Sequence, residues 1–103
     1  MAIPVNKTTL VDASAAATGN ATVSDADEFH VSRFYVSISA AATVDIEGSP
    51  DGGVTWFELD SLTATGVREL DRPFNDLRVS WTGNTGTLSV FLEQFYDKDT
   101  ATV

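Results

Sequence analysis

The only histidine is the first residue to test for chemistry. His30 lies in the segment "DADEFHVS". Three carboxylates precede it, at Asp25, Asp27 and Glu28. A Ser-His-Asp triad would need Ser32 or a distant serine beside the imidazole, and both serine and aspartate are so common in this chain that the pairing has almost no specificity. One histidine without cysteine also makes a poor zinc site. We therefore predict no catalytic residue, no metal site and no cofactor, and expect that the protein is not an enzyme.

Carboxylates offer two further hypotheses. Fifteen acidic residues make some close pair inevitable, so acid–base chemistry on a sugar is only weakly indicated. A calcium loop is the second hypothesis, because oxygen-bearing side chains recur at a suitable spacing. They are Asp45, Glu47, Ser49, Asp51 and Glu58. However, Pro50 stands at the sixth loop position, where this motif needs glycine, so we favour a turn.

The stretch "SPDGGVTW" is the most distinctive local pattern. The carboxylate of Asp51 can accept hydrogen bonds from turn amides. Gly52 and Gly53 can adopt the positive φ that a tight hairpin needs. The ring of Trp56 can cover the hairpin. We predict a structural turn formed by Ser49, Asp51, Gly52, Gly53, Thr55 and Trp56.

This stretch also resembles a known local motif. Its pattern S-x-D-x-G-x-T-W matches the Asp-box, a hairpin motif of sialidase propellers that also occurs in unrelated β proteins. A propeller needs several blades of about four strands each, and this chain can hold two blades at most. The resemblance therefore implies a hairpin, and it does not imply glycoside cleavage.

Length and composition indicate one globular domain spanning residues 1–103. Hydrophobic residues make up 43% and charged residues 20% of the chain, which is ordinary for a folded protein. No apolar run approaches the roughly 20 residues that span a membrane, and the N-terminus lacks the pattern of a secretory signal. The chain has no cysteine, so its stability must come from packing or from subunit assembly.

The charge balance bears on partners. Six basic residues face fifteen acidic ones, for a net charge of −9. Such a surface repels phosphate backbones, so we expect no nucleic-acid partner. The charge suits a partner with a basic patch, and it also serves plain solubility.

A period of two dominates the chain. In "FHVSRFYVSIS", Phe34, Val36 and Ile38 alternate with polar residues, and "LRVSW" and "TLSVFLEQF" behave in the same way. Turn residues separate these runs. The spacing predicts an all-β, antiparallel, jelly-roll-like β-sandwich of about eight short strands. The strands are expected near 7–11, 20–24, 28–39, 42–48, 54–60, 66–71, 76–82 and 86–95. Residues 1–6 and 97–103 are expected to be arms, either loose or docked on a neighbour.

Aromatic residues are candidates for a sugar-stacking platform. They are Tyr35, Trp56, Trp81 and Tyr96. Trp81, however, shares its strand face with Leu77 and Val79, which favours a place in the core.

Three arginines in the second half are interface candidates. Arg68, Arg72 and Arg78 can bond bidentately in a buried contact. The alternative is pairing with nearby carboxylates, which is worth little at a surface. Those carboxylates are Glu69, Asp71 and Asp76.

The second half resembles small structural proteins of tailed bacteriophages. The similar segments are a strand ending in "EGS", the hairpin "DGGVTW", the segment "LDSLTATG" and the run "LRVSWTGNTGTLSV". The resemblance covers about half of the chain and carries over no functional residue. It implies a β-sandwich virion component, and the small size and the Ala, Ser and Thr content are similar to those of capsid decoration (cement) proteins.

This resemblance implies a function and partners. We expect a homotrimer, assembled in the host cytoplasm, that bridges major capsid protein subunits in the virion and has no membrane partner. The alternatives are a tail or fibre-adaptor module and, in another class, a carbohydrate-binding module.

Overall fold

A computed structural model describes residues 4–23, 31–70 and 76–95, and the described part of the chain contains eight β-strands and no helix. No span able to cross a membrane as a helix occurs within those residues. The strands are β1 (Pro4–Ser14), β2 (Gly19–Val23), β3 (Val31–Ile38), β4 (Thr43–Ser49), β5 (Phe57–Leu62), β6 (Gly66–Leu70), β7 (Asp76–Thr82) and β8 (Leu88–Phe95).

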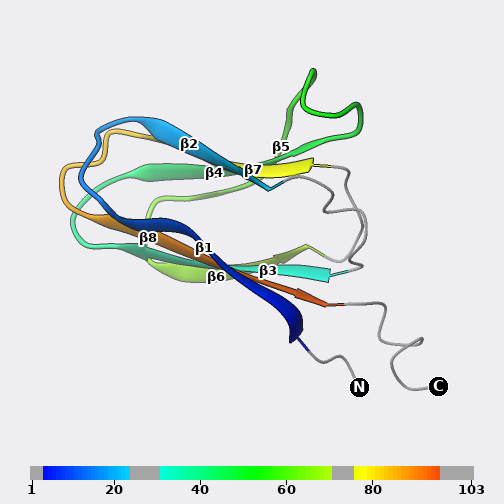
Figure 1. The fold of residues 1–103 in the computed structure, drawn as a ribbon. Coiled ribbons are helices and arrows are strands. Elements are labelled where there is room, and N and C mark those ends of the chain that lie inside the picture. The colour runs from blue at the N-terminus through cyan, green and yellow to red at the C-terminus, as the bar shows by residue number, and fades with distance from the viewer. Residues whose placement is uncertain (1–3, 24–30, 71–75, 96–103) are drawn as a thin grey trace.

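The strands form two four-stranded sheets that lie face to face (Figure 1). Sheet A has the order β1-β8-β3-β6, and sheet B has the order β2-β7-β4-β5. Every pairing between neighbours is antiparallel. Apart from β4 and β5, which are paired neighbours in sheet B, successive strands alternate between the sheets in the manner of a jelly roll. The predicted fold class, an all-β jelly-roll-like sandwich, is confirmed.

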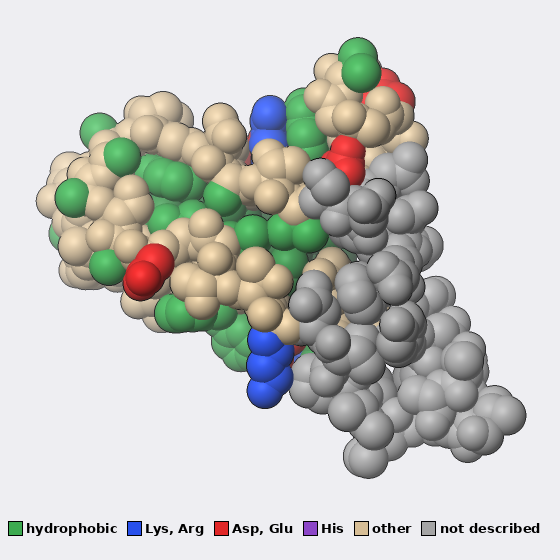
Figure 2. All heavy atoms as spheres, viewed as in Figure 1, with side chains coloured by type: hydrophobic (Ala, Val, Ile, Leu, Met, Phe, Trp, Pro, Cys, Tyr) green, Lys and Arg blue, Asp and Glu red, His purple; other side chains and the backbone are tan. Residues whose placement is uncertain are grey.

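Alternate residues of the strands fill the space between the sheets. Phe34 and Val36 of β3 and Val44 and Ile46 of β4 are at most 2% exposed. The same alternation continues in β7 and β8. On the face shown in Figure 2, hydrophobic side chains lie between the two layers. The remaining core side chains include Val11, Leu62, Leu77, Val79, Trp81, Leu88, Val90 and Leu92.

Two edge strands carry inward-pointing charges. Arg68 of β6 is opposite buried Phe34, and Asp60 of β5 is opposite buried Ile46, so both charged side chains share the inner faces. The Arg68 Nε and Asp60 Oδ2 atoms are 3.1 Å apart, which links the two sheets. Inward charges at sheet edges discourage pairing with a strand of another molecule.

Some predicted boundaries were wrong. The strand expected at 54–60 begins only at Phe57, and residues 54–56 belong to the preceding loop. Residues 4–6, expected in the N-terminal arm, begin β1. His30, Arg72, Tyr96 and the predicted arm at 97–103 lie outside the described residues.

Candidate interaction surfaces

The outer face of sheet A carries a row of alternating charge. Lys7 of β1 is opposite Glu93 of β8, Glu93 is opposite Arg33 of β3, and Arg33 is opposite Glu69 of β6. Directly opposite residues share a face, so the four side chains cross the whole sheet. We call this line, Lys7–Glu93–Arg33–Glu69, the charged row.

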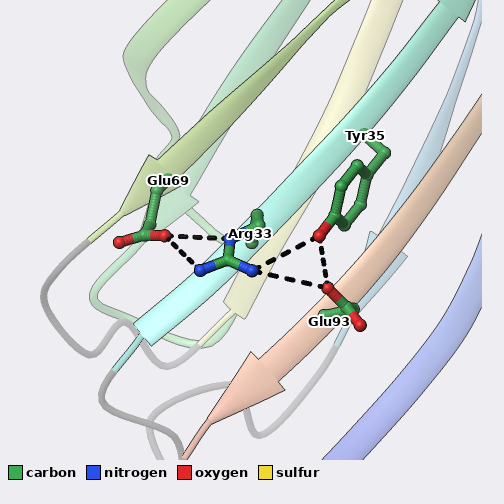
Figure 3. A network of polar contacts seen from close by, with 4 residues as sticks. All are labelled: Arg33, Tyr35, Glu69 and Glu93. Carbon is green, nitrogen blue, oxygen red and sulfur yellow. Dashed lines mark hydrogen bonds and ion pairs between the residues drawn. The ribbon is translucent and has the colours of Figure 1, made fainter. Parts of the chain in front are cut away.

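Arg33 is the centre of the polar contacts in this row (Figure 3). Its Nε donates to Glu69 Oε2 at 2.9 Å, and its Nη1 donates to the Tyr35 hydroxyl at 3.3 Å. That hydroxyl donates in turn to Glu93 Oε1 at 2.5 Å. The hydrogen bonds with Tyr35 and then with Glu69 raise the pKa of Arg33 above its ordinary value. Arg33 is therefore a permanent cation held in one orientation by three strands.

An aromatic row lies beside the charged row, two residues along each strand. It consists of Thr9 of β1, Phe91 of β8, Tyr35 of β3 and Val67 of β6, each opposite the next. Phe91 is 44% and Val67 49% exposed. Open hollows of about 390 and 230 Å³ flank the Tyr35–Phe91 pair. Large exposed apolar side chains gathered on one face indicate an interaction surface.

The loop between β4 and β5 is a second exposed feature and projects from the sandwich (Figure 1). Asp51 Oδ1 accepts hydrogen bonds from the Ser49 hydroxyl at 2.8 Å, the Val54 amide at 3.2 Å and the Thr55 amide at 2.8 Å. Ser49 Oγ also accepts from the Gly53 amide at 2.9 Å. These bonds, with that from Thr55 first and that from Ser49 next, lower the pKa of Asp51 to about 2.

Glycine conformation and an aromatic ring complete the loop. Gly52 and Gly53 have φ of 78° and 92°, values that favour glycine. Trp56 Nε1 donates to the Gly53 carbonyl at 3.1 Å. The structure thus brings the predicted turn residues together, in a wider loop than a tight hairpin. Val54 is 82% and Phe57 56% exposed, and Figure 2 shows hydrophobic side chains at the tip of the projecting loop.

Two of the predicted interface arginines contact carboxylates across strands. Arg78 Nε donates to Glu47 Oε1 of the neighbouring strand at 2.7 Å, and Arg68 pairs with Asp60. Both carboxylates lie farther along the sequence than those expected as partners, and strand register places Glu47 directly opposite Arg78. Arg72 lies outside the described residues.

The carboxylates that suggested a calcium loop bind different partners. Asp45 Oδ1 accepts from the Ser61 hydroxyl at 2.8 Å, Glu47 binds Arg78, and Asp51 binds loop amides. Within the described ranges, no three His, Cys, Asp or Glu side chains are grouped in a way that could hold a metal ion.

The proposed aromatic platform is wrong as a set. Trp81 is 5% exposed, and its Nε1 donates at 3.0 Å to the Ala16 carbonyl in the connection between β1 and β2. Tyr35 lies on the outer face of sheet A, whereas Trp56 lies in the loop that leads into sheet B. Tyr96 is outside the described residues. The described members of this set therefore cannot form one stacking surface.

The outer face of sheet A was not predicted from the sequence as an interaction surface. One signal was present, because Phe91 interrupts the alternation of "TLSVFLEQF" with an aromatic side chain at an outward position. An outward aromatic residue in a half-buried strand favours a contact with another molecule. The charged row had no comparable signal, since its members come from four distant segments.

Comparisons with known proteins agree on the fold. No protein-family model and no curated protein sequence matches the chain. The SPBc2 prophage-derived protein YomS superposes with a TM-score of 0.74 at 13% identity, over 92% of this chain and 96% of YomS. The Yersinia pseudotuberculosis-derived mitogen superposes with a TM-score of 0.59 at 13% identity, over 94% and 90% of the two chains. At these identities the similarity is one of fold.

Proposed function

We propose that this protein is a structural component of a tailed-phage virion, specifically a decoration protein that bridges major capsid protein subunits. The carrying observation is the likeness to a prophage-derived protein over nearly the whole length of both chains. This likeness supports a phage origin, which the resemblance in the second half of the sequence also implies. The jelly-roll fold is also one that viral capsid domains use.

The β4–β5 loop is the proposed contact with the capsid. Its shape is set within the chain by the bonds of Ser49 and Asp51, so little conformational freedom is lost on binding. Its exposed Val54 and the adjacent Phe57 supply apolar area that a capsid pocket can bury. A pre-shaped projecting loop with apolar side chains suits insertion between neighbouring subunits.

Bridging explains how such a protein would stabilise a capsid. A ligand that binds only the assembled state shifts the equilibrium toward that state by mass action. The net charge of −9 favours a basic patch on the capsid and disfavours contact with the packaged nucleic acid. The copy number of three implied by the phage resemblance stays a prediction.

The proposal is tested by co-expression with the major capsid protein encoded in the same phage or prophage genome. We expect the chain to co-sediment with assembled capsids and to raise their melting temperature. Val54→Ser should reduce the bound amount several-fold while leaving the chain folded, because it removes apolar area at the tip of the loop.

Ala64→Ser is the matched control. Ala64 is exposed in the turn after β5, at the opposite end of that strand from the loop, so its substitution should leave capsid binding unchanged. Sedimentation with tails instead of capsids would favour the tail-module alternative. Absence from both particles would contradict a virion role.

A further inference from the structure

The two rows on the outer face of sheet A form a self-complementary pattern. In strand order β1-β8-β3-β6, the charged row has the signs plus, minus, plus, minus. Reversing the order of such a row places the opposite sign at every position. A second copy turned to reverse the strand order therefore presents a carboxylate to each cation and a cation to each carboxylate.

One symmetry operation achieves this reversal. A two-fold axis parallel to the strands, between β8 and β3, places β1 over β6 and β8 over β3 of a second copy. Lys7 then faces Glu69 of the other molecule, and Arg33 faces Glu93. Because isologous contacts are reciprocal, each of these pairs occurs twice.

The same operation also matches the aromatic row to itself. An axis parallel to the strands preserves position along the strand, so the aromatic row of one copy meets that of the other. Phe91 then faces Tyr35, and Thr9 faces Val67. The hollows beside the Tyr35–Phe91 pair leave room for the side chains of the facing copy. Aromatic side chains that meet at the centre of an interface are the usual hot spots.

We infer that the outer face of sheet A binds a second copy of this chain, in a two-fold dimer whose facing sheets pack through the charged and aromatic rows. Sheets packed face to face with nearly aligned strands are a common arrangement, and this symmetry axis produces it. The inference does not depend on the capsid role. It predicts two copies in the free protein where the phage resemblance implies three, and the solution mass distinguishes them.

Charge favours a second copy over an unrelated partner. The chain carries a net charge of −9, yet the charged row holds two cations and two carboxylates. A uniformly basic or acidic partner gains no net attraction from such a row. A second copy gains an attractive contact at all four positions while its other acidic surfaces stay apart.

A charge swap provides the test. The first measurement is solution mass by sedimentation over a concentration series, where we expect about 22 kDa, twice the 11.0 kDa chain. Lys7→Glu and Glu69→Lys, each alone, put like charges opposite one another twice per dimer. Each should raise the dissociation constant about tenfold or more. The double variant restores opposite charges and should recover the dimer.

Recovery of the dimer in the double variant can come only from contacts between molecules. Lys7 and Glu69 lie on the two edge strands of sheet A, three strand spacings or about 14 Å apart, so the swap cannot create a pair within one chain. Phe91→Thr is a second variant, expected to weaken the dimer without altering any charge. Glu58→Lys, an exposed reversal on β5 of sheet B, is the matched control and should leave the mass unchanged.

Several outcomes would overturn the two-fold dimer. A wild-type mass of 11 or 33 kDa at every concentration would do so, and 33 kDa would leave the capsid proposal standing. Failure of a folded double variant to recover the dimer would also reject it. Should the double variant not fold, because Arg33 loses its bond to Glu69, the result with Phe91→Thr decides, and an unchanged dimer would reject the proposed face.

Discussion

The guanidinium of Arg78 lies over the ring of Trp56, with its central carbon 4.3 Å from the ring centroid. The same guanidinium donates through Nε to Glu47 at 2.7 Å. Arg78 is on β7 and Glu47 on β4, while Trp56 lies in the loop before β5, so one side chain joins two strands of sheet B to the loop. This arrangement fixes the base of the projecting loop to the sheet.

Arg78→Lys should destabilise the protein by about 0.5–1 kcal/mol, because lysine keeps the charge but loses the planar stacking on Trp56. Urea unfolding followed by far-ultraviolet circular dichroism measures this change without relying on the altered tryptophan. Arg68→Lys is the matched control, since its side chain is 41% exposed and its pairing with Asp60 is worth little. Equal losses in the two variants would contradict a stacking contribution from Arg78.

Gly53→Val should destabilise the loop by about 1–3 kcal/mol. Gly53 has φ of 92°, a region that β-branched residues strongly disfavour. A Cβ there would lie 3.5 Å from Trp56 Cζ2 and from Asp76 Oδ2, which is ordinary van der Waals contact, so the cost lies in the backbone. Thermal unfolding and amide exchange of residues 49–56 measure the effect. Val54→Ala changes the next residue, which is exposed, and should be nearly neutral. A loss of stability equal to that of Gly53→Val would argue against a backbone cause.

The strands were predictable because alternation determines which face each residue takes. In β3, β7 and β8 the residues expected to be apolar and inward are buried, except Ile38, which is half-buried against the core. Residues 54–56 were misassigned as strand because valine, threonine and tryptophan all favour strands. Asp51 overrides that preference, since its carboxylate engages the Val54 and Thr55 amides. A local side-chain bond thus competed successfully with strand propensity.

The candidate surface on sheet A was less predictable because it depends on register. Lys7, Arg33, Glu69 and Glu93 are ordinary exposed charges when each is viewed in its own segment. They form a row only after β8 pairs with β1 and β3, and β3 pairs with β6. Pairing between strands far apart in sequence is not encoded by local alternation.

Gly19→Ala should destabilise the fold by about 1–3 kcal/mol through overpacking. An added Cβ would lie 2.5 Å from Trp81 Cζ2, and Trp81 is buried and bonded to the Ala16 carbonyl. The double variant with Trp81→Phe should show coupling, because phenylalanine lacks the ring atoms that clash. Urea unfolding of the four proteins of this cycle measures it. Asn20→Ala, at the exposed neighbouring position, is the control, and purely additive losses would contradict the clash.

Acid should weaken the β4–β5 loop through Asp51. Its pKa is about 2 in the folded protein against an ordinary value of 3.8, so folding favours the charged form. The resulting stabilisation is fully present above about pH 4 and is lost as the pH falls toward about 2. Asp51→Asn cannot titrate, so its melting temperature should lie below that of the wild type near neutral pH. This gap should narrow through the same acid window.

Carboxyl-carbon NMR during an acid titration tests the cause directly, because it reports the protonation of Asp51 itself. We expect a midpoint near 2. Glu58→Gln removes a charge of the same sign from the adjoining strand and controls for the change in net charge. A midpoint near 3.8 for Asp51 would mean that its hydrogen bonds to the Thr55 amide and the Ser49 hydroxyl do not persist in solution. The projecting loop would then lack the internal order on which its proposed capsid contact depends.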